Sequence, residues 1–155
     1  VSGHGPYPTN KPYYDDAFRT SISGKPPRFT SGEEEVRLVH NGFQRLAGVG
    51  MHSRQWRFTE KDMILSDDIK GQGIQCVRRR FMTSLKAKTG KGGVVLTHYG
   101  NAGNQSFLLS SPNTEAIVLK TTLWQAYGKA RDGFSISFSD KSSLPWSGEI
   151  RLEVI

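Results

Sequence analysis

The stretch IQCVRRRFMTS, residues 74–84, has the composition of a β-strand and no helical spacing of its apolar residues. Because side chains alternate across a strand, Val77, Arg79 and Phe81 share one face, and Arg78 and Arg80 share the other. Since at most one face can be the apolar core, we expect Arg79 to be structural, paired with Asp67, Asp68 or a Glu residue. Arg78 and Arg80 are then candidate contacts for an anion.

The same strand-like composition recurs along most of the chain. Nine short segments rich in β-branched and aromatic residues are separated by turn sequences: VRLVH, RQWRFT, MILSD, IQCVRRRFMTS, GVVLTHY, SFLLS, AIVLKTTL, FSISFS and EIRLEVI. No window has a sustained helical period. The sequence therefore predicts an all-β domain, an antiparallel β-sandwich of a supersandwich-like kind, over residues 31–155. Residues 1–30 hold five of the seven prolines, which predicts an extended, loop-like segment.

The positive charge of the chain is concentrated in one segment. The formal net charge is +7, and no Asp or Glu lies between Ile69 and Thr114, where there are seven Lys and Arg residues. The remainder has 21 − 7 = 14 basic residues against all 14 acidic ones. A localised basic field favours a polyanionic partner such as an acidic polysaccharide, a nucleic acid or a membrane surface. A solvated, solubilising face is the alternative.

Metal, nucleotide and nucleophilic chemistry have no local motif here. His40 and His52 are twelve residues apart, and neither has the neighbouring ligands of a zinc site. We expect both to form hydrogen bonds in loops and at strand ends. Cys76 is the only cysteine, GKGG lacks the frame of a phosphate loop, and no G-x-S-x-G occurs. We therefore predict no catalytic residue, no metal and no cofactor in this chain.

The order of residues from 40 to 81 resembles the C-terminal β-sandwich of the heparinase II/III-like polysaccharide lyases. That family has a His-Asp-Gly-Tyr element, a His-x-Arg-x-Trp strand, a strand ending in Asp, a Gly-x-Gly turn and a strand ending in Arg-Phe. The matching residues here are His40-Asn41-Gly42-Phe43, His52-Ser53-Arg54-Gln55-Trp56, Ile64 to Asp67, Gly71-Gln72-Gly73 and Arg80-Phe81. The sequence AYG at 126–128 and the pair Leu144-Pro145 match later strands, so that the resemblance covers roughly residues 36–155.

The departures from this pattern concern the reaction itself. Asn41 and Phe43 replace the acidic residue and the tyrosine. The family's His-x-His strand and its Arg-Ser-Thr…His-Asn-Thr segment are not recognisable, although AFRTS at 17–21 is similar to the start of the second. The resemblance implies that the catalytic tyrosine belongs to an upstream helical catalytic domain. We therefore expect the isolated chain to be inactive.

The resemblance implies a function in the cleavage of acidic, uronate-containing polysaccharides such as glycosaminoglycans, by β-elimination. The sandwich would support the catalytic domain and form part of the substrate wall. The residues that we expect to contact the sugar are His40, Asn41, Arg54 and Tyr99, with Arg78 and Arg80. The family resemblance implies a periplasmic or secreted protein, and the start at Val1 suggests a processed protein or a piece of a longer one. We predict no membrane partner, because no segment has the length of a membrane span.

Two other functions are compatible with the same residues. The chain could be a non-catalytic carbohydrate-binding β-sandwich, in which the basic segment would carry the whole function. A nucleic-acid-binding β-domain is permitted by the charge, but no RNA-binding signature is present, so we expect no specific nucleic-acid partner.

Overall fold

The computed structural model describes residues 1–6, 26–101, 103–126 and 128–155. Most of the predicted loop-like segment 1–30, including AFRTS, lies outside the described residues. Eleven strands make up the described secondary structure: β1 (Arg28–Ser31), β2 (Glu35–His40), β3 (Val49–Phe58), β4 (Asp62–Gly71), β5 (Ile74–Thr83), β6 (Lys86–Gly90), β7 (Gly93–Gly100), β8 (Gly103–Ser110), β9 (Ala116–Ala126), β10 (Lys129–Ser143) and β11 (Trp146–Val154). In these residues, no helix is long and apolar enough to cross a membrane.

The strands form two sheets. The hydrogen-bonded order is β1-β2-β3-β4-β11-β8-β7-β6 in the larger sheet and β5-β10-β9 in the smaller one. The strand pairs with a defined register, such as β1 with β2, β7 with β8 and β9 with β10, are antiparallel. The predicted all-β, antiparallel sandwich class is confirmed.

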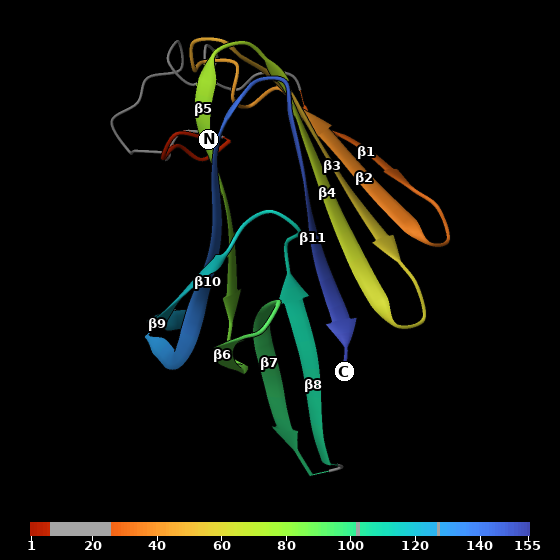
Figure 1. Ribbon diagram of the computed structural model, residues 1–155, viewed down its shortest axis with the longest axis vertical. Helices are drawn as coiled ribbons and strands as arrows, with labels where there is room; N and C mark the ends of the chain where they lie inside the picture. Colours follow the sequence, from red (N-terminus) through yellow and green to blue (C-terminus); the bar gives the residue numbers. More distant parts are fainter. Residues whose placement is uncertain (7–25, 102, 127) are drawn as a thin grey trace. The chain divides into compact units, whose positions relative to one another are not determined.

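The described chain divides into two compact units, and β4, β5, β10 and β11 contribute residues to both. Unit 1 consists of Val1–Phe58, Leu65–Val77 and Lys141–Gly148. It contains the meander β1-β2-β3, whose strands run side by side in Figure 1. Its core is a cluster of buried side chains from distant segments: Val1, Phe43, Val49, Ile69, Val77, Leu144 and Trp146.

Unit 2 consists of Thr59–Ile64, Arg78–Asp140 and Glu149–Ile155. It contains the antiparallel β6-β7-β8 meander and the β9-β10 pair. Its most buried apolar side chains are those of Val94, Leu96, Leu109, Ile136, Phe138 and Ile150. The rings of Phe81 and Phe138 pack edge to face with their centroids 6.2 Å apart, a geometry that aromatic pairs prefer.

The predicted alternation along β5 is observed. Val77 and Arg79 are 5% exposed, whereas Arg78 and Arg80 are exposed to solvent. Arg79 is buried, and its Nη2 donates to the Ser111 hydroxyl at 3.1 Å, while its expected pairing with an acidic residue stays a prediction. Arg78 donates through Nε to the Ser139 hydroxyl at 3.2 Å. The basic residues of this strand therefore separate into one structural and two solvent-facing side chains.

Several strands are longer or more numerous than the sequence pattern indicated. Two of the separating sequences that turn composition predicts as turns, DDIKGQG at 67–73 and ARDG at 130–133, lie mostly in strands, so this prediction is wrong: β4 continues to Gly71, and β10 begins at Lys129. The short strands β1 and β6 were not predicted, and β1 spans the predicted boundary between residues 30 and 31. Both have weak hydrophobic signals, RFTS and KAKTG, in the sequence. Their strand conformation therefore depends on backbone pairing with β2 and β7.

Candidate functional site

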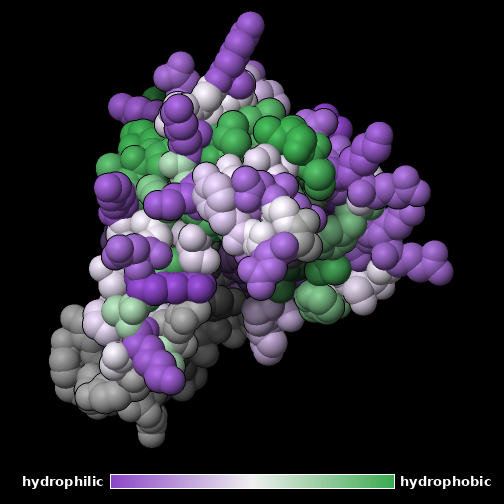
Figure 2. Space-filling model, turned by 90° about the horizontal axis from the view of Figure 1, so that it is seen from below, coloured by the Kyte–Doolittle hydropathy of each residue, from purple (hydrophilic) through white to green (hydrophobic). Residues whose placement is uncertain are grey.

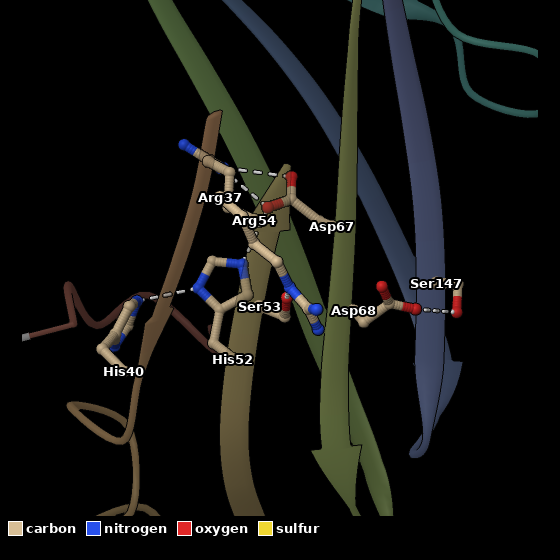
Figure 3. Close-up of polar contacts among 8 residues, drawn as sticks. All are labelled: Arg37, His40, His52, Ser53, Arg54, Asp67, Asp68 and Ser147. Atoms are coloured by element: carbon tan, nitrogen blue, oxygen red, sulfur yellow. Dashed lines mark hydrogen bonds and ion pairs between the residues drawn. The ribbon is translucent and has the colours of Figure 1, made fainter. Parts of the chain in front are cut away.

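The two histidines that stand out in the sequence meet in unit 1. The register of β2 and β3 places His40 directly opposite His52, and each is 8% exposed. Arg54 lies two residues beyond His52 and therefore on the same face of β3. Asp67 comes from the neighbouring strand β4 and is 2% exposed. These four side chains form what we call the His–Asp–Arg network (Figure 3).

The hydrogen bonds of this network run in one direction. The Gly42 backbone N–H donates to His40 Nδ1 at 3.1 Å, so the proton of a neutral His40 ring is on Nε2. His40 Nε2 lies 2.9 Å from His52 Nδ1, and His52 Nε2 lies 2.7 Å from Asp67 Oδ1. If each ring carries one proton, His40 donates to His52, and His52 donates to Asp67. The network thereby assigns a single tautomer to each neutral histidine.

Arg54 completes the network at the carboxylate. Its Nε donates to Asp67 Oδ1 at 2.7 Å and its Nη2 donates to Oδ2 at 3.0 Å, which is the bidentate geometry that fixes a guanidinium in place. The Arg54 side chain is 30% exposed, whereas that of Asp67 is 2% exposed. Arg54 therefore bridges a buried carboxylate and the solvent-accessible part of unit 1.

The environment keeps His40 neutral and Asp67 charged at neutral pH. Burial, together with smaller effects of the neighbouring His52 and Arg54, lowers the pKa of His40 to about 4, although the charge of Asp67 acts in the opposite direction. Burial alone would raise the pKa of Asp67, but the hydrogen bonds from His52 and Arg54 outweigh burial, and its pKa is lowered. His40 can therefore offer hydrogen bonds to a ligand but no positive charge. In this network, only Arg54 carries a cation that is constant with pH.

The loop between β2 and β3 closes over the histidines. Phe43, 6% exposed, packs with its ring centroid 5.6 Å from His40 and 5.8 Å from His52. The loop turns back through backbone hydrogen bonds and reaches Gly48, whose φ of +76° favours glycine. A Cβ at Gly48 would lie 2.5 Å from the carbonyl oxygen of Gln72. Close backbone packing thus holds the lid formed by Phe43 over the network.

A hollow of about 440 Å³ adjoins His40 in unit 1. Its lining combines polar side chains with apolar ones, among them Arg28, His40, Asn41, Gln44 and Met51. Asn41 donates through Nδ2 to Gln44 Oε1 at 3.0 Å, while its Oδ1 is buried and has no hydrogen-bond partner among the described residues. A buried acceptor of this kind is costly unless a donor reaches it. The polar side chains in the lining suit a ligand with hydroxyl or amide groups.

The predicted site residues fall in both units. His40, Asn41 and Arg54 are near one another in unit 1, as the strand register and the hydrogen bonds show. Tyr99, which is 64% exposed on β7, and the exposed Arg78 and Arg80 on β5 belong to unit 2. The expectation that His40 and His52 form hydrogen bonds is confirmed. The described part of the chain contains no group of three His, Cys, Asp or Glu side chains placed to hold a metal ion.

The direct pairing of the histidines and the burial of Asp67 were not predicted from the sequence. The residues between His40 and His52 form a hairpin loop flanked by strand residues, a spacing compatible with antiparallel partners. This spacing does not identify the pair, because register also depends on turn geometry and on packing against other strands. Asp67 was expected at the end of a strand, since DD followed by a Gly-rich sequence is typical of a turn, whereas β4 continues past it to Gly71.

No protein-family model matches the sequence, and no curated protein matches it significantly. The fold, however, is similar to that of solved polysaccharide lyases. A mutant of heparan sulfate lyase HepC from Pedobacter heparinus superposes with a TM-score of 0.65 at 12% identity, and a heparinase III with a TM-score of 0.61 at 14% identity. A heparinase III gene product gives 0.63 at 11% identity. In each case the match covers 83% of this chain and 21% of the other. The chain thus spans about a fifth of those structures and has the fold of a β-domain within them.

Proposed function

We propose that this chain is the C-terminal β-sandwich of a bacterial lyase that cleaves uronate-containing polysaccharides by β-elimination. One observation carries the proposal: the chain shares its fold, over 83% of its length, with structures named heparan sulfate lyase and heparinase III. The ordered motifs from His40 to Phe81 support the same assignment independently. The proposed role of the domain is to support an upstream helical catalytic domain and to form part of the substrate wall.

The chemistry of β-elimination explains which groups such a wall would supply. A base removes the proton at C5 of the uronate, an acid protonates the leaving oxygen, and cations or amides neutralise the sugar carboxylate. This chain offers groups of the third kind, with Arg54 and the Asn41 amide in unit 1 as the best placed. Further proposed contacts are Tyr99, Arg78 and Arg80. His40, which is neutral, would form hydrogen bonds to the sugar. We assign no proton-transfer step to this chain and expect it to be inactive alone.

The charge distribution favours a second function, a non-catalytic polyanion-binding module. Of the seven basic residues in the acid-free segment, only Arg79 is buried; the exposed ones are Lys70, Arg78, Arg80, Lys86, Lys88 and Lys91. Exposed cations attract any polyanion over long distances, and this attraction is screened by salt. Binding that depends strongly on salt, with similar affinity for DNA and heparin, would indicate this nonspecific mode.

The test is the absorbance of the unsaturated uronate product. The 155-residue chain and the longer form that the proposal requires are each incubated with heparin, heparan sulfate, hyaluronan and alginate. Product from the longer form only supports an accessory sandwich of a lyase. Product from the isolated chain would contradict the placement of the chemistry upstream. Absence of product from both, together with polyanion binding by the isolated chain, would favour the binding module.

A further inference from the structure

One face of the β1-β2-β3 meander carries a strip of apolar and aromatic side chains. Directly opposite residues in an antiparallel pair lie on the same face. The register pairs Phe29 with Leu38 and Leu38 with Arg54, and it pairs Val36 with Trp56. Phe58 follows Trp56 by two residues and continues the same face of β3. We call Phe29, Val36, Leu38, Trp56 and Phe58 the aromatic strip. It begins where the His–Asp–Arg network ends, at Arg54.

The aromatic strip is accessible to solvent. Phe29 is 64% exposed and Phe58 is 44% exposed, while Val36, Leu38 and Trp56 are half-buried. Figure 2 shows hydrophobic surface lying between hydrophilic side chains on one side of the molecule. The opposite face of the same strands is polar, with Arg37 donating to the Ser53 hydroxyl and Gln55 donating to Glu35. The meander therefore has one hydrophilic face and one apolar face that remains partly open, which is typical of a binding surface.

Arg54 gives this surface a directed polar group. Its Nε and Nη2 are held by Asp67, and its Nη1 is not used by those two hydrogen bonds. The Arg54 Cζ lies 5.8 Å from the centroid of the Trp56 ring. A guanidinium that is fixed on one side by a buried carboxylate is preorganised to bind a second anionic group on its free edge. A half-buried aromatic ring beside a fixed donor is the combination that small-ligand sites use for packing and orientation.

We infer that the aromatic strip and Arg54 bind one uronate residue, with the sugar ring packed against Trp56 and flanked by Phe29, and the sugar carboxylate accepting hydrogen bonds from Arg54. Adjacent strands are about 4.8 Å apart, so Phe29 and Arg54, which are two strands apart, are separated by about 10 Å. This inference rests on the proposed function and adds the surface on which the acidic sugar is recognised. The loss of affinity caused by Arg54→Lys should depend little on salt, because Asp67 offsets the charge of Arg54 and this recognition uses short, directed contacts, unlike the attraction by the exposed cations of the chain.

The experiment measures binding of a heparan sulfate tetrasaccharide and of its carboxyl methyl ester to the full 155-residue chain by titration calorimetry. Trp56→Ala and Phe29→Ala remove the ring contacts, and Arg54→Lys removes the planar donor pair. The matched controls are Trp124→Ala, at a tryptophan that is 71% exposed in unit 2, and Arg37→Lys, on the hydrophilic face of β2. Amide spectra show whether each variant is folded. Because Phe29 is 64% exposed, Phe29→Ala should leave the chain folded. This variant therefore tests binding by the aromatic strip even if Arg54→Lys unfolds the chain.

We expect Trp56→Ala and Arg54→Lys to weaken binding of the tetrasaccharide about tenfold, and Phe29→Ala about threefold. The controls should bind like the wild type, and the methyl ester should bind wild type and Arg54→Lys equally. If the wild type binds and none of the three substitutions changes its affinity, the inference that the aromatic strip binds the uronate residue is wrong, and the proposed function is unaffected. If the wild-type chain does not bind but the longer form cleaves heparan sulfate, the strip is again overturned. If the chain does not bind and the longer form does not cleave, the proposed function fails as well.

Discussion

Acidification should destabilise the fold through His40 at pH values where carboxylates are still ionised. The pKa of His40 is 6.5 in a model peptide and about 4 in the folded chain. Between these values the unfolded chain binds a proton that the folded chain excludes, so stability is lost as the pH falls through 6.5 and the loss is complete near 4. Between about pH 7.5 and about pH 4.5 the expected loss is about 2.5 kcal/mol.

The network explains why the proton is excluded. Protonation of His40 at Nδ1 would set its new N–H against the Gly42 N–H. That event breaks a buried hydrogen bond and adds a positive charge beside Arg54. The contribution of Asp67 is separate: its pKa is lowered below 3.8, so its stabilisation is lost only at lower pH.

The assay is urea unfolding of wild type and His40→Asn across this range of pH. Asn at position 40 can still accept the Gly42 N–H but does not titrate. The stability advantage of the wild type over His40→Asn should therefore shrink by about 2.5 kcal/mol on acidification. His98→Asn makes the same change at an exposed position, and its curve should parallel that of the wild type. A wild-type advantage over His40→Asn that is constant with pH would show that His40 does not carry this pH dependence.

Three further predictions concern stability and are measured by urea or thermal unfolding. Asp67→Asn should cost about 3 kcal/mol because it removes the buried counter-ion of the partly exposed Arg54, whereas Asp68→Asn, where the side chain accepts a hydrogen bond from the Ser147 hydroxyl, should cost less than about 1 kcal/mol. Gly48→Ala should destabilise far more than Gly73→Ala: both have positive φ, but only at Gly48 would a Cβ meet a backbone oxygen at 2.5 Å. Phe138→Ala, at a side chain 1% exposed, should cost about 3–5 kcal/mol, and a loss below about 1 kcal/mol would contradict its place in the core of unit 2.

The course of β4 shows why part of the site could not be read from sequence. Ile69 packs in the core of unit 1, and alternation along the strand places Asp67 on the same inner face. Within its own segment an aspartate at such a position is unfavourable, which is why a strand that ends at Asp67 was the better local prediction. The groups that make its burial possible, His52 and Arg54, come from a different strand. Local patterns do not contain that compensation.

The all-β class, the two faces of β5 and the concentration of basic residues in one segment follow from the amino-acid sequence alone. These properties are local, because side chains alternate with a period of two and charges are counted along the chain. The sequence also carried the ordered motifs by which the chain resembles a lyase domain. The folded chain is needed to see that His40 lies opposite His52, that Asp67 is buried beside Arg54, and that aromatic side chains of β1 and β3 share one open face. Those facts depend on strand register and on burial, which arise from hydrogen bonds and packing between segments distant in sequence.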